Sequence, residues 1–256
     1  ELCPCKIYAV TGSDGKTTTT SIIAEFLKAQ GRNVHLGGNI GKPLLPEIES
    51  IQPEDCAVVE LSSFQLISMR QSPAVAVVTN LSPNHLDVHK DMQEYIDAKK
   101  NIFLHQSAFS RTVLNAGNEI TAAFASEVRG DCWMFQRGQQ VDRGVWCDEK
   151  SIYVNGQELM PVSQIKIPGW HNVENYMAAI AAVWGDVTPE TIRRVAAEFN
   201  GVEHRAEFVR EVRGVKYYND SIATSPTRVI SGMLSLFSQK IVMIAGGYDK
   251  HIPFEP

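Results

Sequence analysis

The sequence predicts an α/β fold with a mostly parallel sheet, and three apolar segments in its first hundred residues carry that prediction. Residues 7–10, 56–59 and 74–78 are each apolar or β-branched, and each ends in polar or glycine-rich sequence. Continuous apolar runs are typical of central strands in a parallel sheet that helices cover on both faces. Because ligands of such sheets gather at the carboxyl ends of the strands, we expect the three polar endings to meet in one crevice.

Helices are predicted between and after these strands. Residues 17–30 carry apolar side chains at helical spacing, and Gly31 supplies a stop. Residues 91–106 repeat that spacing. A third helix follows Pro168-Gly169, and a fourth begins near Thr188-Pro189, where proline suits the first helical turn.

Short strands are expected from Asp131 onwards. Asn155-Gly156 lies between two strand-like runs, residues 151–154 and 157–159, and this dipeptide is a strong hairpin signal.

A second α/β domain is predicted to open after Asn200-Gly201. Strand-like segments recur at residues 215–218 and 240–245, but the chain stops at Pro256. Two strands do not bury a sheet by themselves. We therefore expect the chain to be a fragment that ends inside this second domain.

The composition excludes several classes of protein. The chain has 256 residues, 44% hydrophobic and 21% charged, as in ordinary globular proteins. A net charge of -5 without a basic cluster argues against nucleic-acid binding. Every apolar run is shorter than the roughly 18 residues of a membrane span, so no membrane insertion is expected, and the start lacks a signal-peptide pattern. Five scattered cysteines fit neither a disulfide framework nor a zinc site, which favours the cytoplasm.

The strongest motif lies between the first predicted strand and the first predicted helix. Backbone N–H groups and the helix N-terminus can cradle phosphate oxygens there, with Lys16 as a point charge and the Thr17 hydroxyl directed at magnesium. The general P-loop pattern has glycine where this chain has Val10, so the match is to a shorter variant. The alternative is a glycine turn that merely precedes a helix. The candidate ATP-binding residues of this loop are Gly12, Ser13, Asp14, Gly15, Lys16, Thr17 and Thr18.

Glu60 is a candidate magnesium ligand because it ends an apolar strand, where an unpaired carboxylate is costly. Capping of the backbone around Leu61 is the alternative for this residue. His85 follows the third strand, where a metal or catalytic role competes with that of an ordinary surface histidine. Lys99 and Lys100 pose the same question, and their spacing alone does not decide it.

Asn172 and Asn175 lie three residues apart and therefore on one face of a helix start. Two amides on one face can read a purine or ribose edge, whereas helix capping by Asn172 is the simpler alternative.

Taken together, these motifs resemble the Mur ligase family. The segments that carry the resemblance are TGSDGKTTTT, HLGGNIGKPLL, ELSSFQL, NHLDVH, PGWHNVEN, EHR and NDSIATSP. They cover nearly the whole chain in this order, which makes the resemblance highly specific. ELSSFQL and NDSIATSP look like the member that adds D-glutamate to UDP-N-acetylmuramoyl-L-alanine.

The resemblance implies a P-loop-type central ATPase domain over residues 1–201 and the start of a Rossmann-like, amino-acid-binding C-terminal domain over residues 202–256. It also implies a UDP-binding domain that precedes these two in the family, and we expect none within these 256 residues. The nucleotide-contacting positions that it adds to the loop are Asn172, Asn175, Arg205 and Asp220.

The resemblance further implies two magnesium ions and a substrate site. Lys16 and Thr17 would hold the phosphates and one ion, which Glu60 would share. His85 would contact the second ion, bridged by a lysine that the family carries as a carbamate and that we match to Lys99. The implied substrate-binding residues are Asn39, Ser62, Thr224 and Lys250. One departure is Ile222, where many members have lysine.

The implied reaction transfers the γ-phosphoryl group of ATP to a carboxylate, and the amine of D-glutamate then attacks the acyl phosphate. Lys16, Asn39, His85 and Lys99 would be catalytic, in a full-length enzyme that we expect to be a monomer. Two rivals stay open: a ligase like folylpolyglutamate synthase, and a nucleotide-binding module without ligase activity. We expect the fragment alone to bind Mg-ATP weakly and not to ligate.

Overall fold

The computed structural model describes residues 2–82, 89–223 and 229–247 and divides the chain into two compact units. The first comprises Glu1–Lys166 and His171–Phe199, and the second comprises Ile167–Trp170 and Asn200–Pro256. The candidate phosphate loop lies in the first unit.

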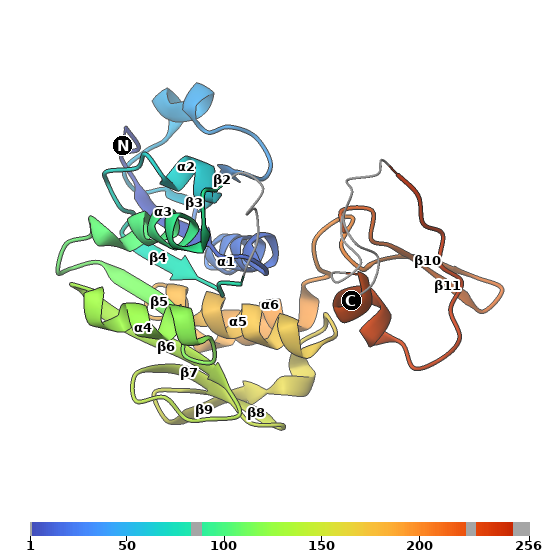
Figure 1. The fold of residues 1–256 in the computed structure, drawn as a ribbon. Coiled ribbons are helices and arrows are strands. Elements are labelled where there is room, and N and C mark those ends of the chain that lie inside the picture. Colours follow the sequence, from blue (N-terminus) through green and yellow to red (C-terminus); the bar gives the residue numbers. More distant parts are fainter. Residues whose placement is uncertain (1, 83–88, 224–228, 248–256) are drawn as a thin grey trace. The chain divides into compact units, whose positions relative to one another are not determined.

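One sheet of nine strands forms the frame of the described part of the first unit, with β2 at one edge and β9 at the other (Figure 1). Its order is β2-β3-β1-β4-β5-β6-β7-β8-β9. All pairs from β2 to β7 are parallel, and β8 and β9 add an antiparallel edge. The mostly parallel α/β prediction is confirmed. The strands are β1 (Lys6–Thr11), β2 (Val34–Gly38), β3 (Cys56–Glu60), β4 (Val75–Val78), β5 (Arg111–Asn115), β6 (Asp131–Arg137), β7 (Gly144–Cys147), β8 (Ser151–Val154) and β9 (Gln157–Pro161).

Six α-helices accompany this sheet in the described residues. They are α1 (Lys16–Ala29), α2 (Ser63–Leu66), α3 (Met92–Leu104), α4 (Glu119–Ala123), α5 (Trp170–Val183) and α6 (Pro189–Glu198). Helix α1 packs beside α5 and α6, and the rings of Phe26 and Tyr176 meet edge to face at 6.0 Å. The four helices expected from the sequence are confirmed to within a few residues, and Asp91 and Thr188 cap α3 and α6 as short polar residues do.

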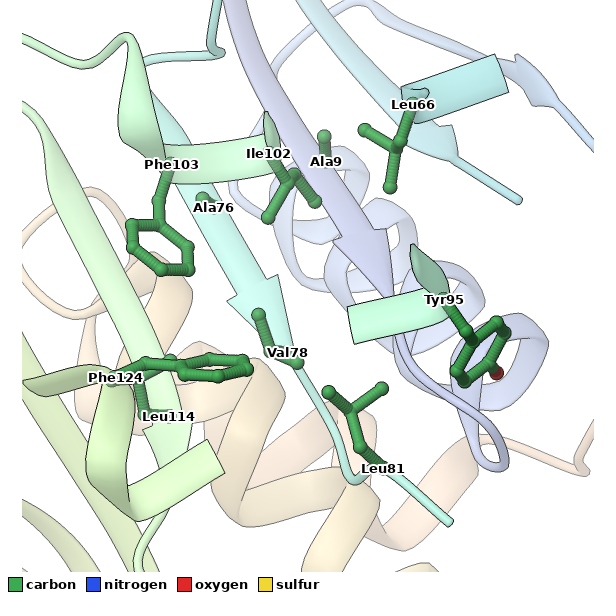
Figure 2. Close-up of a cluster of buried hydrophobic side chains, with 10 residues drawn as sticks. All are labelled: Ala9, Leu66, Ala76, Val78, Leu81, Tyr95, Ile102, Phe103, Leu114 and Phe124. Atoms are coloured by element: carbon green, nitrogen blue, oxygen red, sulfur yellow. The ribbon is translucent and has the colours of Figure 1, made fainter. Parts of the chain in front are cut away.

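A cluster of buried side chains joins α2, α3 and the segment after α4 to the centre of the sheet (Figure 2). It combines Ala9 of β1 and Val78 of β4 with Leu66 of α2 and Ile102 of α3. Tyr95 lies at the opposite end of this cluster from Phe103 (Figure 2). Burial of each such large apolar side chain contributes about 1.5–3 kcal/mol, so this cluster fixes α2 and α3 on the strands that carry the site.

The predicted hairpin is confirmed between β8 and β9. Val154 pairs with Gln157, and Asn155 and Gly156 both have positive φ angles, 48° and 82°. Two consecutive positive φ angles are what a type I′ turn requires, which is why Asn-Gly predicts it.

In the second unit the described residues form a different sheet from the one expected. Strands β10 (Glu207–Val212) and β11 (Val215–Asn219) pair antiparallel, so the strand predicted at residues 215–218 is confirmed and β10 was missed. The strand predicted at residues 240–245 is wrong: the segment has no strand structure, and Val242 and Ile244 are 95% and 98% exposed. Its apolar composition suits a strand, but a strand needs a hydrogen-bonded neighbour, and the described residues of this unit supply none. A Rossmann-like domain here stays a prediction.

Candidate functional site

Three neighbouring strand ends build the candidate site. β1 lies between β3 and β4, so their carboxyl ends meet at one edge of the sheet, as the sequence predicted. The register continues past the strands, where Leu61 N–H donates to Val10 O and Thr79 N–H donates to Thr11 O. This edge therefore brings together the glycine-rich loop, Glu60 and the Thr79-Asn80 segment.

The loop is held by the segment that follows β4. Ser13 N–H donates to Asn80 O at 2.8 Å, and Asp14 N–H donates to the Asn80 side-chain oxygen at 2.9 Å. The Ser13 hydroxyl is fully buried, donates to Ser82 O and lies 3.0 Å from the Tyr95 hydroxyl. Ser13, expected to bind nucleotide, thus has its side chain engaged in shaping the loop.

Gly15 makes the entry to α1 possible. It is the N-cap residue with φ 78°, and a side chain there would clash with the amide oxygen of Asn175. Only glycine adopts this left-handed conformation at little cost. Thr19 N–H donates to Gly15 O, so the N–H groups of Thr17 and Thr18 precede the first intrahelical bond. A 14-residue helix beginning this way offers its positive end to an anion.

Lys16 folds back over the loop that it follows. Its ammonium donates to Gly12 O and to Ser13 O, each at 3.0 Å. A positive charge is therefore held beside the loop backbone, where a phosphate would need it.

Glu60 is the buried carboxylate at the end of β3, only 2% exposed. The Thr17 hydroxyl donates to Oε2 at 2.7 Å, and the Asn39 amide donates to Oε1 at 3.0 Å. Gly38 is required next to it, since a Cβ there would clash with the Glu60 backbone. In these contacts the Glu60 carboxylate accepts from two side chains and does not cap the backbone around Leu61.

The chemistry of these oxygens suits magnesium. A carboxylate and a hydroxyl are hard donors, and Mg²⁺ commonly binds one or two carboxylates and keeps several waters. Among the described residues no group of three or more His, Cys, Asp or Glu side chains is arranged to hold a metal. Glu60 and Thr17 supply one carboxylate and one hydroxyl of this kind.

Lys99 reaches the loop from α3. It is 2% exposed, and its ammonium donates to Thr11 Oγ1 and to Gly12 O, each at 3.0 Å. Burial, and then the nearby charge of Lys16, lower the pKa of Lys99 to about 7, although Glu60 acts in the opposite sense. Lys100 instead forms an ion pair with Glu127 at 2.6 Å, away from the loop. Of the two adjacent lysines, only Lys99 contacts the loop.

Asn172 and Asn175 lie on α5 against the start of α1. The Thr19 hydroxyl donates to the Asn175 side-chain oxygen at 3.2 Å, and the Asn175 amide lies 3.4 Å from the Asn172 oxygen. Asn172 lies in the first turn of α5, which begins at Trp170. The pair stands next to Gly15, at the helix end that would face a nucleotide.

Ser62 caps α2. Gln65 N–H donates to its hydroxyl, and the Gln65 side chain accepts from Ser62 N–H at 2.9 Å, which completes a capping box. Its hydroxyl also donates to the Gln65 side-chain oxygen. Ser62 thus caps α2, a structural role that was not expected when the sequence indicated a substrate-binding residue.

Five of the predicted residues lie outside the described part of the first unit. Arg205 and Asp220 belong to the second unit, where Asp220 accepts from Ala206 N–H at 2.9 Å. His85, Thr224 and Lys250 lie outside the described residues.

Three residues that shape the site were not among the predicted site residues, namely Asn80, His89 and Tyr95. The polar ending Thr79-Asn80 was visible as a signal, but its role in holding the loop was not. The helical spacing of residues 91–106 predicted the helix that contains Tyr95, but the contact of its hydroxyl with Ser13 depends on a tertiary arrangement that periodicity does not encode.

Comparison with known proteins decides the family. Residues 10–183, more than half of the chain, match the model of the Mur ligase middle domain.

The chain belongs to the Mur ligase family.

Curated relatives in this family are similar over nearly the whole chain. UDP-N-acetylmuramoylalanine--D-glutamate ligase of Clostridium kluyveri is 54% identical over 253 residues, 99% of this chain and 55% of that protein. The protein of the same name in Acetivibrio thermocellus is 57% identical over 259 residues, which cover all of this chain and 55% of the relative. The chain therefore spans about half the length of these curated relatives.

Solved Mur ligase structures share the fold. MurF from Acinetobacter baumannii has a TM-score of 0.74 at 21% identity, covering 88% of this chain and 52% of that one. UDP-N-acetylmuramate-alanine ligase MurC from Thermotoga maritima has a TM-score of 0.69 at 23% identity, covering 91% of this chain and 56% of that one. At these identities the likeness supports the fold alone.

The helices in the described part of the chain include none that is both long enough and apolar enough to cross a membrane.

Proposed function

We propose that the chain is the nucleotide-handling part of an ATP-dependent ligase that joins the amine of D-glutamate to the carboxylate of UDP-N-acetylmuramoyl-L-alanine. The names of the two curated relatives supply these substrates. Such a reaction belongs to the synthesis of peptidoglycan precursors for the cell wall. Activity is proposed for a protein that contains the rest of the relatives' length as well as this chain.

One observation carries the proposal. The Thr17 hydroxyl, the Glu60 carboxylate and the N-terminus of α1 converge beside a loop that holds the Lys16 ammonium. This arrangement provides a magnesium ligand, a cation and oriented backbone donors within one site, which is what phosphoryl transfer needs from a protein.

The roles of the loop residues follow from their contacts. Backbone donors from Gly15 to Thr18 would receive the terminal phosphates of ATP, and Lys16 would move from the loop carbonyls to a phosphate oxygen. Thr17 and Glu60 would hold Mg²⁺. ATP supplies the phosphoryl group that converts a carboxylate, a poor acyl donor, into an acyl phosphate, while Mg²⁺ offsets the phosphate charge.

Asn39 and Lys99 would serve the acceptor carboxylate and a second magnesium ion. The Asn39 amide that now donates to Glu60 would contact the activated carboxylate. Lys99 carries a pKa of about 7, so much of its amine is neutral near neutral pH, and the neutral amine is the form that can become a carbamate. A carbamate would turn this lysine into a carboxylate-like ligand for a second Mg²⁺, shared with His85.

The remaining predicted contacts complete the proposal. Asn172 and Asn175 would receive the nucleoside of ATP, together with Arg205 and Asp220. Ser62 would contact the acceptor substrate, and Thr224 and Lys250 would contact D-glutamate. We also propose a cytoplasmic location, consistent with five free cysteines.

Phosphate release tests this function. The full-length protein should release phosphate from ATP only when UDP-N-acetylmuramoyl-L-alanine and D-glutamate are both present, because acyl-phosphate turnover needs both the acceptor and the amine. A chromatographic assay should show the amide product. Turnover that instead required a folate and L-glutamate would contradict the substrate assignment, and ATP binding without any turnover would leave only a nucleotide-binding module.

A further inference from the structure

His89 is a buried histidine to which the proposed reaction gives no role. It is 4% exposed and lies between α2 and α3, two residues before the N-cap of α3. Burial of a polar ring costs free energy unless its nitrogens find hydrogen-bond partners.

The ring of His89 connects the first turn of α2 to α3. Its Nε2 lies 2.8 Å from the Ser63 hydroxyl. Its plane stacks on Phe64 at 5.2 Å with 4° between the rings, and it meets the edge of Tyr95 at 5.3 Å and 66°. Its Nδ1 lies 3.8 Å from Oε2 of Glu94, which is in the first turn of α3.

Tyr95 continues this path to the phosphate loop. Its hydroxyl lies 3.0 Å from Ser13 Oγ, and the Lys99 ammonium lies 4.9 Å from the centre of its ring. A chain of contacts thus runs from Ser63 through His89 and Tyr95 to Ser13. It links the residue after Ser62 to the loop that would hold ATP.

The two ends of this path are not equally dependent on it. The loop has separate anchors on Asn80 and Ser82, and Glu60 is fixed by Thr17 and Asn39 as well as by its strand. Helix α2 has only four residues, and its far end is held by Leu66 in the core and by the Asn101 amide on Leu66 O. Loss of the His89 contact should therefore displace the start of α2 more than the loop.

We propose that His89 is a positioning residue that sets the start of α2, and with it Ser62, at the correct distance from the phosphate loop. This role rests on the proposed function, in which Ser62 contacts the acceptor carboxylate substrate and the loop contacts ATP. Loss of the His89 contact should therefore weaken binding of the acceptor substrate and leave binding of the nucleotide unchanged.

Two single variants and their combination test this role in the full-length protein. His89→Phe keeps a ring between Phe64 and Tyr95 but removes the nitrogen that meets Ser63, and Ser63→Ala removes the other partner with the smallest change. His105→Gln is the matched control, because His105 is an exposed histidine at the opposite end of α3. The measurements are the KM for UDP-N-acetylmuramoyl-L-alanine from phosphate release and the Kd for Mg-ATP from calorimetry.

We expect each single variant to raise the acceptor KM by about tenfold and the double variant to raise it no further, because both changes remove one shared contact. The Kd for Mg-ATP should stay within about twofold of the unaltered protein in every case, and His105→Gln should change neither quantity.

Three results would overturn this inference: an unchanged acceptor KM in both single variants, additive effects in the double variant, or a parallel loss of Mg-ATP affinity. The last would assign His89 to general support of the fold. If the unaltered protein released no acceptor-dependent phosphate, the proposed function would fail first, and the role of His89 would fall with it.

Discussion

Glu60 and Lys99 are opposite charges buried around the same loop, and each depends on specific partners. Glu60 receives hydrogen bonds from Thr17 and Asn39, which offset the cost of its burial. Lys99 donates to two oxygens, but burial, and then the nearby charge of Lys16, lower its pKa and disfavour its charged form. The two residues were chosen from the sequence by their place in motifs, whereas these partners follow only from the fold.

Lys16→Ala tests the assignment of the loop. The change removes the ammonium that would meet a phosphate, and charged hydrogen bonds of this kind contribute about 1.5–3 kcal/mol, so Mg-ATP affinity should fall by at least about tenfold. Lys28→Ala is the control, because Lys28 is an exposed lysine in the last turn of the same helix, paired with Glu25. Calorimetry should show that Lys28→Ala binds Mg-ATP with normal affinity. Unchanged affinity for Mg-ATP in a folded Lys16→Ala variant would contradict the assignment of the loop to phosphate binding.

The lowered pKa of Lys99 predicts a pH dependence of stability. The pKa is about 7 in the folded protein against the ordinary 10.5, so the unfolded chain binds more protons between these values. Stability therefore rises with pH across this window, and below pH 7 the charged lysine costs up to a few kcal/mol. Lys99→Met should lack this contribution, so its free energy of unfolding should exceed that of the unaltered protein most at pH 6 and least near pH 10.

Denaturant unfolding in bicarbonate-free buffer with a chelator measures this difference without carbamate or metal. Curves of stability against pH that ran parallel for the two proteins would show that Lys99 has an ordinary pKa.

At the scale of elements, the site depends on how β1 passes into α1. The turn uses Gly12 and Gly15 at positive φ angles, and α5 approaches Gly15 so closely that a side chain there would meet Asn175. The strand-loop-helix order was predictable because glycine and apolar periodicity are local signals. The approach of α5 was not, because it joins residues about 160 positions apart.

Gly15→Ala and Gly31→Ala separate conformational strain from this contact. Both glycines have left-handed backbone, φ 78° and 88°, but a Cβ at Gly31 meets nothing within 4 Å. Each variant should lose about 1–2 kcal/mol from the unfavourable φ angle. Gly15→Ala should lose more and should also weaken Mg-ATP binding, because it displaces Asn175. Equal losses of unfolding free energy and equal affinities for Mg-ATP in the two variants would contradict the arrangement of α1 and α5.

At the scale of the whole molecule, the sequence predicted the parallel sheet but not its full extent. The central strands were recognisable because they are apolar on both faces, whereas β2 contains Gly37 and Gly38 and was not recognised as a strand. The segment at residues 240–245 shows the opposite error, since its apolar composition predicted a strand that finds no partner in the described structure. Strand propensity is local, but a strand exists only through its neighbours.

The candidate site could be predicted in its residue types and only partly in its geometry. Lys16, Thr17, Glu60, Asn39 and Lys99 all meet at one edge, as their places at strand ends and in the motifs indicated. The engagement of Ser13 and the contact path through His89 are tertiary features. They depend on how α2 and α3 pack, which no single segment determines.

Calorimetric titration of ATP with and without Mg²⁺, on the unaltered protein and on Glu60→Gln, tests the central claim most directly. We expect Mg²⁺ to strengthen ATP binding to the unaltered protein by at least about tenfold, and Glu60→Gln to remove this gain while metal-free ATP still binds. An equal effect of Mg²⁺ on both proteins would show that the strand-end carboxylate does not hold the metal, and the proposed site would be wrong.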